Sequence, residues 1–237
     1  MTFGLREHNI RAIVVDIEGT TTPVSFVYDI LFPYARRALR AFVREHVDAP
    51  ELRDTWQQIR EDWKQDVARG ENPPDPIVGY AEWLMDRDRK APGLKALQGH
   101  IWKRGYEDGA LKGEVFADVP DAFARWRVAG MTVAIYSSGS VLAQQLLFRT
   151  TTFGDLTPFV DAYFDTGVGP KTSADSYRRI ASALGCPAAA LLFISDTRAE
   201  IDAAREAGCT TLLCVRTSTD QAHGPGPQTI SNFSLVR

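Results

Sequence analysis

The sequence predicts an α/β fold in which a Rossmann-like parallel sheet core carries an inserted all-helical cap. The first observation is a near-continuous apolar run at residues 10–16, which suits a strand buried on both faces. The second is a long segment of helical spacing, and the third is a return to alternating strand and helix patterns. We therefore predict an α/β core formed by residues 1–22 and 116–237, and a helical insert at residues 23–115.

The insert is predicted to be helical because its apolar residues recur at steps of three and four. One such stripe contains Leu31, Ala35, Leu39, Phe42 and Val43. Prolines at residues 71–76 and a second break at residues 91–93 divide the segment into several helices. The core of the insert is expected to include Trp56, Trp63, Trp83 and Trp102. One of the insert's aromatic side chains is also a candidate for contact with a ligand.

The remaining strands of the core are predicted from short apolar runs. These runs are residues 132–136, 162–164, 191–196 and 211–215. Helices are predicted between the runs.

Capping and stop signals mark those helices. Residues 118–120 indicate a helix start and Gly130 its end, while Ser173 is predicted to cap another helix that Gly185 ends. Residues 201–207 have helical spacing as well. The polar stretch 216–228 is predicted to be a surface loop.

The composition excludes several classes of function. The net charge is −3, from 27 basic and 30 acidic residues, and no long basic run is present. We therefore expect no binding to nucleic acid or to a membrane surface. No signal peptide pattern or apolar stretch of about 20 residues is present, so we expect a cytoplasmic protein. The odd count of three cysteines predicts neither a disulfide framework nor a zinc site.

Polar side chains stand where the predicted strands end. Asp16 ends the first strand, Ser137 and Ser138 follow the second, and Asp196 ends a later one. Lys171 lies in the loop after the short strand 162–164. Ligands of open parallel sheets bind beyond the carboxyl ends of the strands, so we expect these residues to form one site.

This set of residues suits a phosphate monoester bound together with a divalent cation. Two carboxylates alone would repel the doubly charged ester, but Mg²⁺ held by Asp16 and Asp196 removes this repulsion and polarises the phosphoryl oxygens. Lys171 adds a further positive charge. Ser137 and the backbone amides after it can donate to phosphate oxygens.

The same set predicts a covalent mechanism. Asp16 can attack phosphorus in line to give an aspartyl-phosphate. Glu18 can then protonate the leaving oxygen and later activate water, or it contributes only its backbone carbonyl. Glu200 is either an acid that supports the site or an ordinary carboxylate at a helix start. Ser140 fits a helix cap better than Ser137 and Ser138 do.

The order of these residues resembles the four motifs of the haloacid dehalogenase superfamily. Residues 16–20 resemble its first motif, and Ser137, Lys171 and Asp196 resemble the other three. The resemblance implies a Rossmann-like core with a cap inserted after the first strand. The departure is Glu18, because most phosphatases of the superfamily have Asp at that position.

Residues 16–23 resemble more specifically the signature of the enolase-phosphatase family of methionine salvage. The similarity continues through residues 31–35, 102–106, 111–113, 134–141 and 176–178. It implies an enzyme that enolises 2,3-diketo-5-methylthiopentyl 1-phosphate and then removes phosphate to leave an acireductone. It also implies a monomer whose only partner is this small-molecule phosphate substrate. The base for enolisation stays open between Glu18 and a residue of the insert.

This resemblance also implies the site residues. One Mg²⁺ per chain would be bound by Asp16, Asp196 and the backbone carbonyl of Glu18. The substrate would be bound by Ser137, Ser138 and Lys171.

Three rival functions are considered. The chain could be a magnesium-dependent phosphatase of the same superfamily that acts on another small ester. It could be a dehalogenase that directs Asp16 against carbon without a metal, although Asp196 and Glu18 argue against this. It could be a non-catalytic binding module, which Glu18 suggests and the intact Asp16, Lys171 and Asp196 disfavour.

Overall fold

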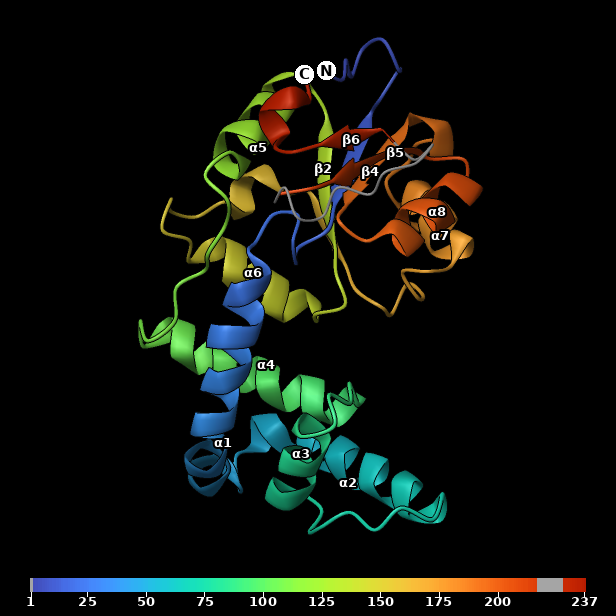
Figure 1. Cartoon of the computed structure of the whole chain (residues 1–237). Coiled ribbons are helices and arrows are strands. Elements are labelled where there is room, and N and C mark those ends of the chain that lie inside the picture. Colours follow the sequence, from blue (N-terminus) through green and yellow to red (C-terminus); the bar gives the residue numbers. More distant parts are fainter. Residues whose placement is uncertain (1, 217–227) are drawn as a thin grey trace. The chain divides into compact units, whose positions relative to one another are not determined.

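The computed structural model describes residues 2–216 and 228–237. The chain divides into two compact units, one made of Met1–Phe26 and Lys112–Arg237 and the other of Val27–Leu111. Figure 1 shows the sheet in the first unit and helices in the second. The boundaries predicted from the sequence lie a few residues from these. Most of the predicted loop 216–228 lies outside the described residues.

Within the described residues, six strands form one sheet in the order β3-β2-β1-β4-β5-β6. The strands are β1 (Ala12–Val15), β2 (Thr132–Tyr136), β3 (Ala162–Phe164), β4 (Leu191–Ser195), β5 (Thr210–Cys214) and β6 (Thr229–Ile230). All neighbouring strands are parallel, which confirms the predicted fold class. The sequence did not predict β6, because a two-residue strand is too short to carry a pattern.

The strand order places two of the predicted site residues side by side. β1 pairs with β2 on one side and with β4 on the other, so that Val15 lies beside Ile135 and Ile194. Along the chain, the strands after β1 are added first on one side, as β2 and β3, and then on the other side, from β4 onward. In such sheets, ligands bind at the switch point between the two sides, which here lies between β1 and β4. Asp16 follows β1 and Asp196 follows β4, so both carboxylates lie at this point.

Helices cover both faces of the sheet (Figure 1). α7 (Ala174–Ala183) and α8 (Arg198–Glu206) lie on one face, and α5 (Val119–Val128) and α6 (Val141–Arg149) lie on the other. The core under α7 and α8 includes the fully buried side chains of Val14, Tyr136, Tyr177, Phe193 and Ile201. This packing fixes the central strands, whose carboxyl ends carry the site.

The starts of α5, α6 and α7 lie where the sequence predicted them, but the predicted Ser173 cap is wrong. Ser140 caps α6 as predicted, since its hydroxyl accepts from the Ala143 amide at 3.3 Å. The Ser173 side chain makes no capping hydrogen bond, and only its carbonyl takes part in the first turn of α7, where it accepts from the Ser176 amide at 3.1 Å. Asp118 precedes α5, but its carboxylate binds Arg216 in place of the helix amides.

The second unit contains the predicted helices. They are the turn η1 (Phe26–Leu31), α1 (Phe32–His46), α2 (Arg53–Ala68), α3 (Val78–Met85) and α4 (Pro92–Glu107), with a short turn η2 (Pro50–Leu52) before α2. α1 and α2 both pack against α4. Trp56, Trp83 and Trp102 are buried as predicted, whereas Trp63 is half-buried and donates to the Pro74 carbonyl at 2.6 Å. No described helix has the length and apolarity needed to cross a membrane.

Phe193 provides a test of the core. Its ring is fully buried in β4 and contacts the Tyr177 ring edge-on at a centroid distance of 4.8 Å. We expect Phe193→Ala to lower the free energy of unfolding by about 3–5 kcal/mol, because it removes an aromatic side chain and leaves a cavity. Phe153 is 51% exposed, and Phe153→Ala should change stability by no more than about 0.5 kcal/mol. Equal denaturant midpoints for the two variants would contradict this core.

Candidate active site

Asp16 leaves the end of β1 with its carboxylate buried and oriented by hydrogen bonds. The residue is 2% exposed. Its Oδ1 accepts from the Ile17 amide at 2.8 Å and from the Lys171 ammonium at 2.5 Å. Its Oδ2 lies 3.2 Å from the Ser195 hydroxyl. Oδ1 is therefore held by two donors, while Oδ2 has one longer contact.

Lys171 lies between two carboxylates. Its Nζ is 2.5 Å from Asp16 Oδ1 and 2.7 Å from Glu200 Oε2. Burial alone would lower the pKa of Lys171, but the negative charges of Asp16 and Glu200 outweigh burial and raise it. The backbone of its loop is fixed by the Tyr177 hydroxyl, which donates to the Lys171 carbonyl at 2.6 Å. The Lys171 side chain is thus a charged ammonium whose position is fixed by Asp16 and Glu200.

Glu200, for which the sequence left two interpretations, belongs to the site. Its carboxylate contacts Lys171 and lies 2.9 Å from the Ser195 hydroxyl. Burial and the charge of Asp16 raise the pKa of Glu200 to about 7, and Lys171 opposes the increase. Ser195 was not predicted from the sequence, although it directly precedes Asp196. Glu200 and Ser195 therefore orient Lys171 and Asp16.

The loop after β1 is a tight turn around the Ile17 carbonyl. That oxygen accepts from the amides of Thr20, Thr21 and Thr22 at 3.2, 2.9 and 2.9 Å. Gly19 has φ +72°, and a Cβ there would overlap the Asp196 carboxylate. Only glycine meets both requirements without strain.

Asp196 is held against this loop. Its amide donates to the Thr20 hydroxyl at 2.9 Å, and its Oδ1 accepts from the Thr197 hydroxyl at 3.1 Å. Burial and the negative charge of Asp16 raise the pKa of Asp196 to about 6. Asp16 and Asp196 thus bring two carboxylates to one point of the sheet, and a bound cation would offset their negative charge.

The residues at this point of the sheet fit Mg²⁺. The described residues contain no cluster of three His, Cys, Asp or Glu side chains able to hold a metal ion. The predicted donors are two carboxylates, Asp16 and Asp196, and one backbone oxygen, that of Glu18. Mg²⁺ is usually bound through one or two carboxylates and keeps several waters, so this small donor set suits it.

Ser137 and Glu18 are brought together at the end of β2. The Ser137 hydroxyl donates to Glu18 Oε2 at 3.3 Å and accepts from the Gly139 amide at 3.1 Å. Ser137 is buried, and the next residue, Ser138, is half-buried. Asp16, Ser137 and Asp196 therefore directly follow strands of the sheet, and Lys171 reaches Asp16 from the loop after β3.

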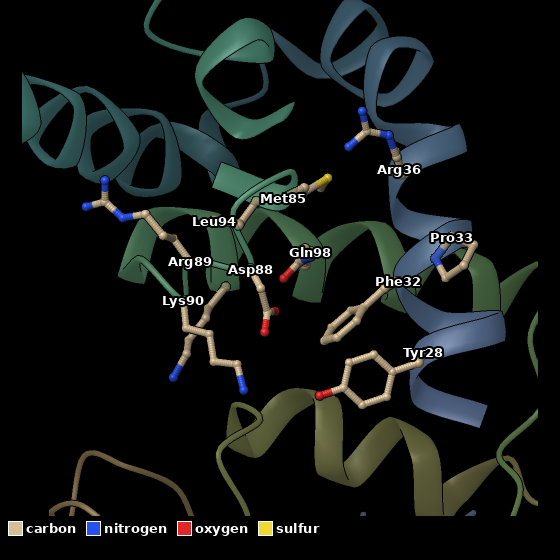
Figure 2. A pocket seen from close by; sticks show the side chains of 11 residues that line it. Tyr28, Phe32, Pro33, Arg36, Met85, Asp88, Arg89, Lys90, Leu94 and Gln98 are labelled. Carbon is tan, nitrogen blue, oxygen red and sulfur yellow. The ribbon is translucent and has the colours of Figure 1, made fainter. Parts of the chain in front are cut away.

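The helical unit has a pocket of its own (Figure 2). Its volume is about 520 Å³, and its apolar wall is formed by Tyr28, Phe32, Met85 and Leu94. Gln98 is 8% exposed and lies in the wall, and no hydrogen bond joins its side chain to another described residue. The pocket therefore offers apolar contact together with one buried amide.

Comparison with known proteins identifies the family. Residues 10–208 match the family described as haloacid dehalogenase-like hydrolase. Enolase-phosphatase E1 of Pseudomonas aeruginosa is 49% identical over 227 residues, which cover 96% of this chain and 98% of that protein. The chain belongs to the enolase-phosphatase family of the haloacid dehalogenase-like hydrolases.

A second curated relative and one solved structure are also similar to this chain. Enolase-phosphatase E1 of Sorangium cellulosum is 50% identical, with 88% of this chain and 89% of that protein covered. The crystal structure of the UTR4 protein of Saccharomyces cerevisiae superposes with a TM-score of 0.76 at 34% identity and covers 94% and 98% of the two chains. The resemblance inferred from residues 16–23 is thereby confirmed. Haloacid dehalogenase-like hydrolases generally depend on Mg²⁺.

Gly19 allows a test of the loop in this enolase-phosphatase. Gly130 also has positive φ, +79°, but a Cβ there would meet nothing within 4 Å. Gly19→Ala and Gly130→Ala should both lose about 1–2 kcal/mol of stability, because each places a side chain in the left-handed region. Only Gly19→Ala should also lose most phosphate release, since it displaces Asp196. If the two variants release phosphate at equal rates, the close contact between Gly19 and Asp196 is not needed for activity and this prediction is wrong.

Proposed function

We propose that this enolase-phosphatase converts 2,3-diketo-5-methylthiopentyl 1-phosphate to an acireductone and phosphate in methionine salvage. The observation that carries the proposal is the carboxylate of Asp16, which is buried, oriented by Lys171 and placed beside Asp196 at the switch point of the sheet. The relatives named enolase-phosphatase supply the substrate class.

Asp16 is the proposed nucleophile. One of its carboxylate oxygens forms a bond to phosphorus while the bond from phosphorus to the ester oxygen breaks. Lys171 holds Oδ1, and this restricts the carboxylate to one orientation before attack. Ser137, Ser138 and Lys171 are proposed to bind the phosphoryl oxygens and the substrate.

Glu18 is the proposed acid and base. As an acid it gives its proton to the departing ester oxygen. As a carboxylate it then takes a proton from water, whose oxygen attacks phosphorus while the bond to Asp16 breaks and free phosphate leaves. The contact of 3.3 Å with Ser137 ties Glu18 to the residue proposed to bind phosphate.

Mg²⁺ is the proposed cofactor, one per chain, held by Asp16, Asp196 and the backbone carbonyl of Glu18. When bound, it supplies positive charge that offsets the ester and polarises its oxygens. The position of Asp196 after β4, next to β1 and Asp16, supports this assignment, because carboxylate oxygens are ligands that Mg²⁺ prefers.

The reaction is tested by following ultraviolet absorbance and phosphate release together with the diketone phosphate as substrate. We expect an enol absorbance followed by phosphate release, with the release lost after chelation and restored by Mg²⁺. Phosphate release from other esters but none from this one would leave the phosphatase chemistry and remove the assignment to methionine salvage.

The nucleophile is tested by Asp16→Asn. The amide keeps the shape of the side chain but cannot form the acyl-phosphate, so phosphate release should fall roughly a thousand-fold or more. Asp175→Asn is a matched control, because Asp175 is an exposed carboxylate in the first turn of α7. Unchanged phosphate release by Asp16→Asn would exclude Asp16 as the nucleophile.

A further inference from the structure

Arg216 follows β5 with its side chain 8% exposed, and its guanidinium makes four hydrogen bonds. Its Nε and Nη2 donate to the carbonyl of Thr20 at 3.0 and 2.6 Å. Its Nη1 donates to both carboxylate oxygens of Asp118 at 2.8 and 2.7 Å. A planar guanidinium can make these four bonds at once, whereas an ammonium cannot.

The guanidinium also lies between two aromatic rings. Its carbon is 4.3 Å from the centroid of Phe116 and 4.7 Å from that of Phe233, close enough for cation–π attraction to both. The Phe233 amide donates to the Asp118 carboxylate at 2.5 Å. Arg216 therefore joins the loop after β1, the segment before α5 and the C-terminal turn Phe233–Leu235.

Thr20 connects this cluster to the proposed cation site. Its carbonyl is held by Arg216, while its hydroxyl accepts from the Asp196 amide at 2.9 Å. The preceding residue, Gly19, lies in such close contact with the Asp196 carboxylate that no side chain would fit between them. A shift of Thr20 would therefore move both Asp196 and the turn that contains Glu18.

We propose that Arg216 is a positioning residue for the cation site, acting through Thr20 on Asp196 and on the backbone of Glu18. Arg216 touches neither substrate nor reacting atoms in this proposal. The proposal gives the C-terminal segment a role in catalysis, because Phe233 contacts the Arg216 guanidinium and donates to Asp118, which also holds that guanidinium. The inference rests on the proposed function only in that Asp16 and Asp196 hold Mg²⁺.

The test is Mg²⁺ binding to Arg216→Met, measured by calorimetry on the whole chain without any ester. We expect the dissociation constant to rise about 10- to 100-fold, as is typical when a partner behind the metal ligands is lost. Arg216→Lys keeps the charge but not the four hydrogen bonds, so it should show most of the same loss. It also supplies the measurement if Arg216→Met does not fold.

Arg125→Met is the matched control. Arg125 donates to the Phe233 carbonyl at 3.0 Å and so supports the same C-terminal turn, but it has no contact with Thr20. It should lower the melting temperature and leave Mg²⁺ affinity unchanged. If the folded Arg216 variants bind Mg²⁺ as tightly as the unsubstituted chain does, the proposal is wrong, while the enzyme's proposed function still stands. Absence of Mg²⁺ binding by the natural chain would instead overturn the proposed cation site and this inference with it.

Discussion

Excess negative charge at the carboxyl edge of the sheet is the constraint around which the site is built. Asp16, Asp196 and Glu200 converge there, and within the described residues Lys171 is the ammonium that pairs with two of them. Three carboxylates thus meet one ammonium, and burial together with the charge of Asp16 raises the pKa values of Asp196 and Glu200. Such a site favours a cation, and the cation in turn makes it able to accept a phosphate ester.

The fold makes this convergence possible at low conformational cost. Adjacent parallel strands β1 and β4 deliver Asp16 and Asp196 to one point, and helices on both faces bury the strands that carry them. The turn after β1 then approaches Asp196 so closely that only glycine fits at position 19. The sheet thus restricts the positions of Asp16 and Asp196, since the turn after β1 contacts Asp196 directly.

The sequence predicted best those features that are encoded in a short stretch of neighbouring residues. Buried strands, proline breaks in the insert and the polar residues at strand ends all lie within short windows, so the fold class and residues such as Asp16 and Asp196 could be predicted. The two-residue strand β6 gave no pattern. Family resemblance added the substrate class, which no residue pattern alone provides.

Contacts between distant segments could not be predicted in the same way. Ser195 and Arg216 became visible only when the sheet brought them beside Asp16 and Thr20. Asp118 illustrates the same limit, since residues 118–120 indicate a helix start but do not reveal that the Asp118 carboxylate binds Arg216. Local propensity gave the correct helix start, but a long-range charge determined what the side chain does.

The most direct measurement is mass spectrometry of the protein, stopped with acid during turnover of the diketone phosphate and digested to peptides. The account predicts one added phosphoryl group on the peptide that contains Asp16, at that residue, and its absence from Asp16→Asn. A phosphoryl group on another residue such as Ser137, or none during rapid turnover, would contradict the covalent role of Asp16.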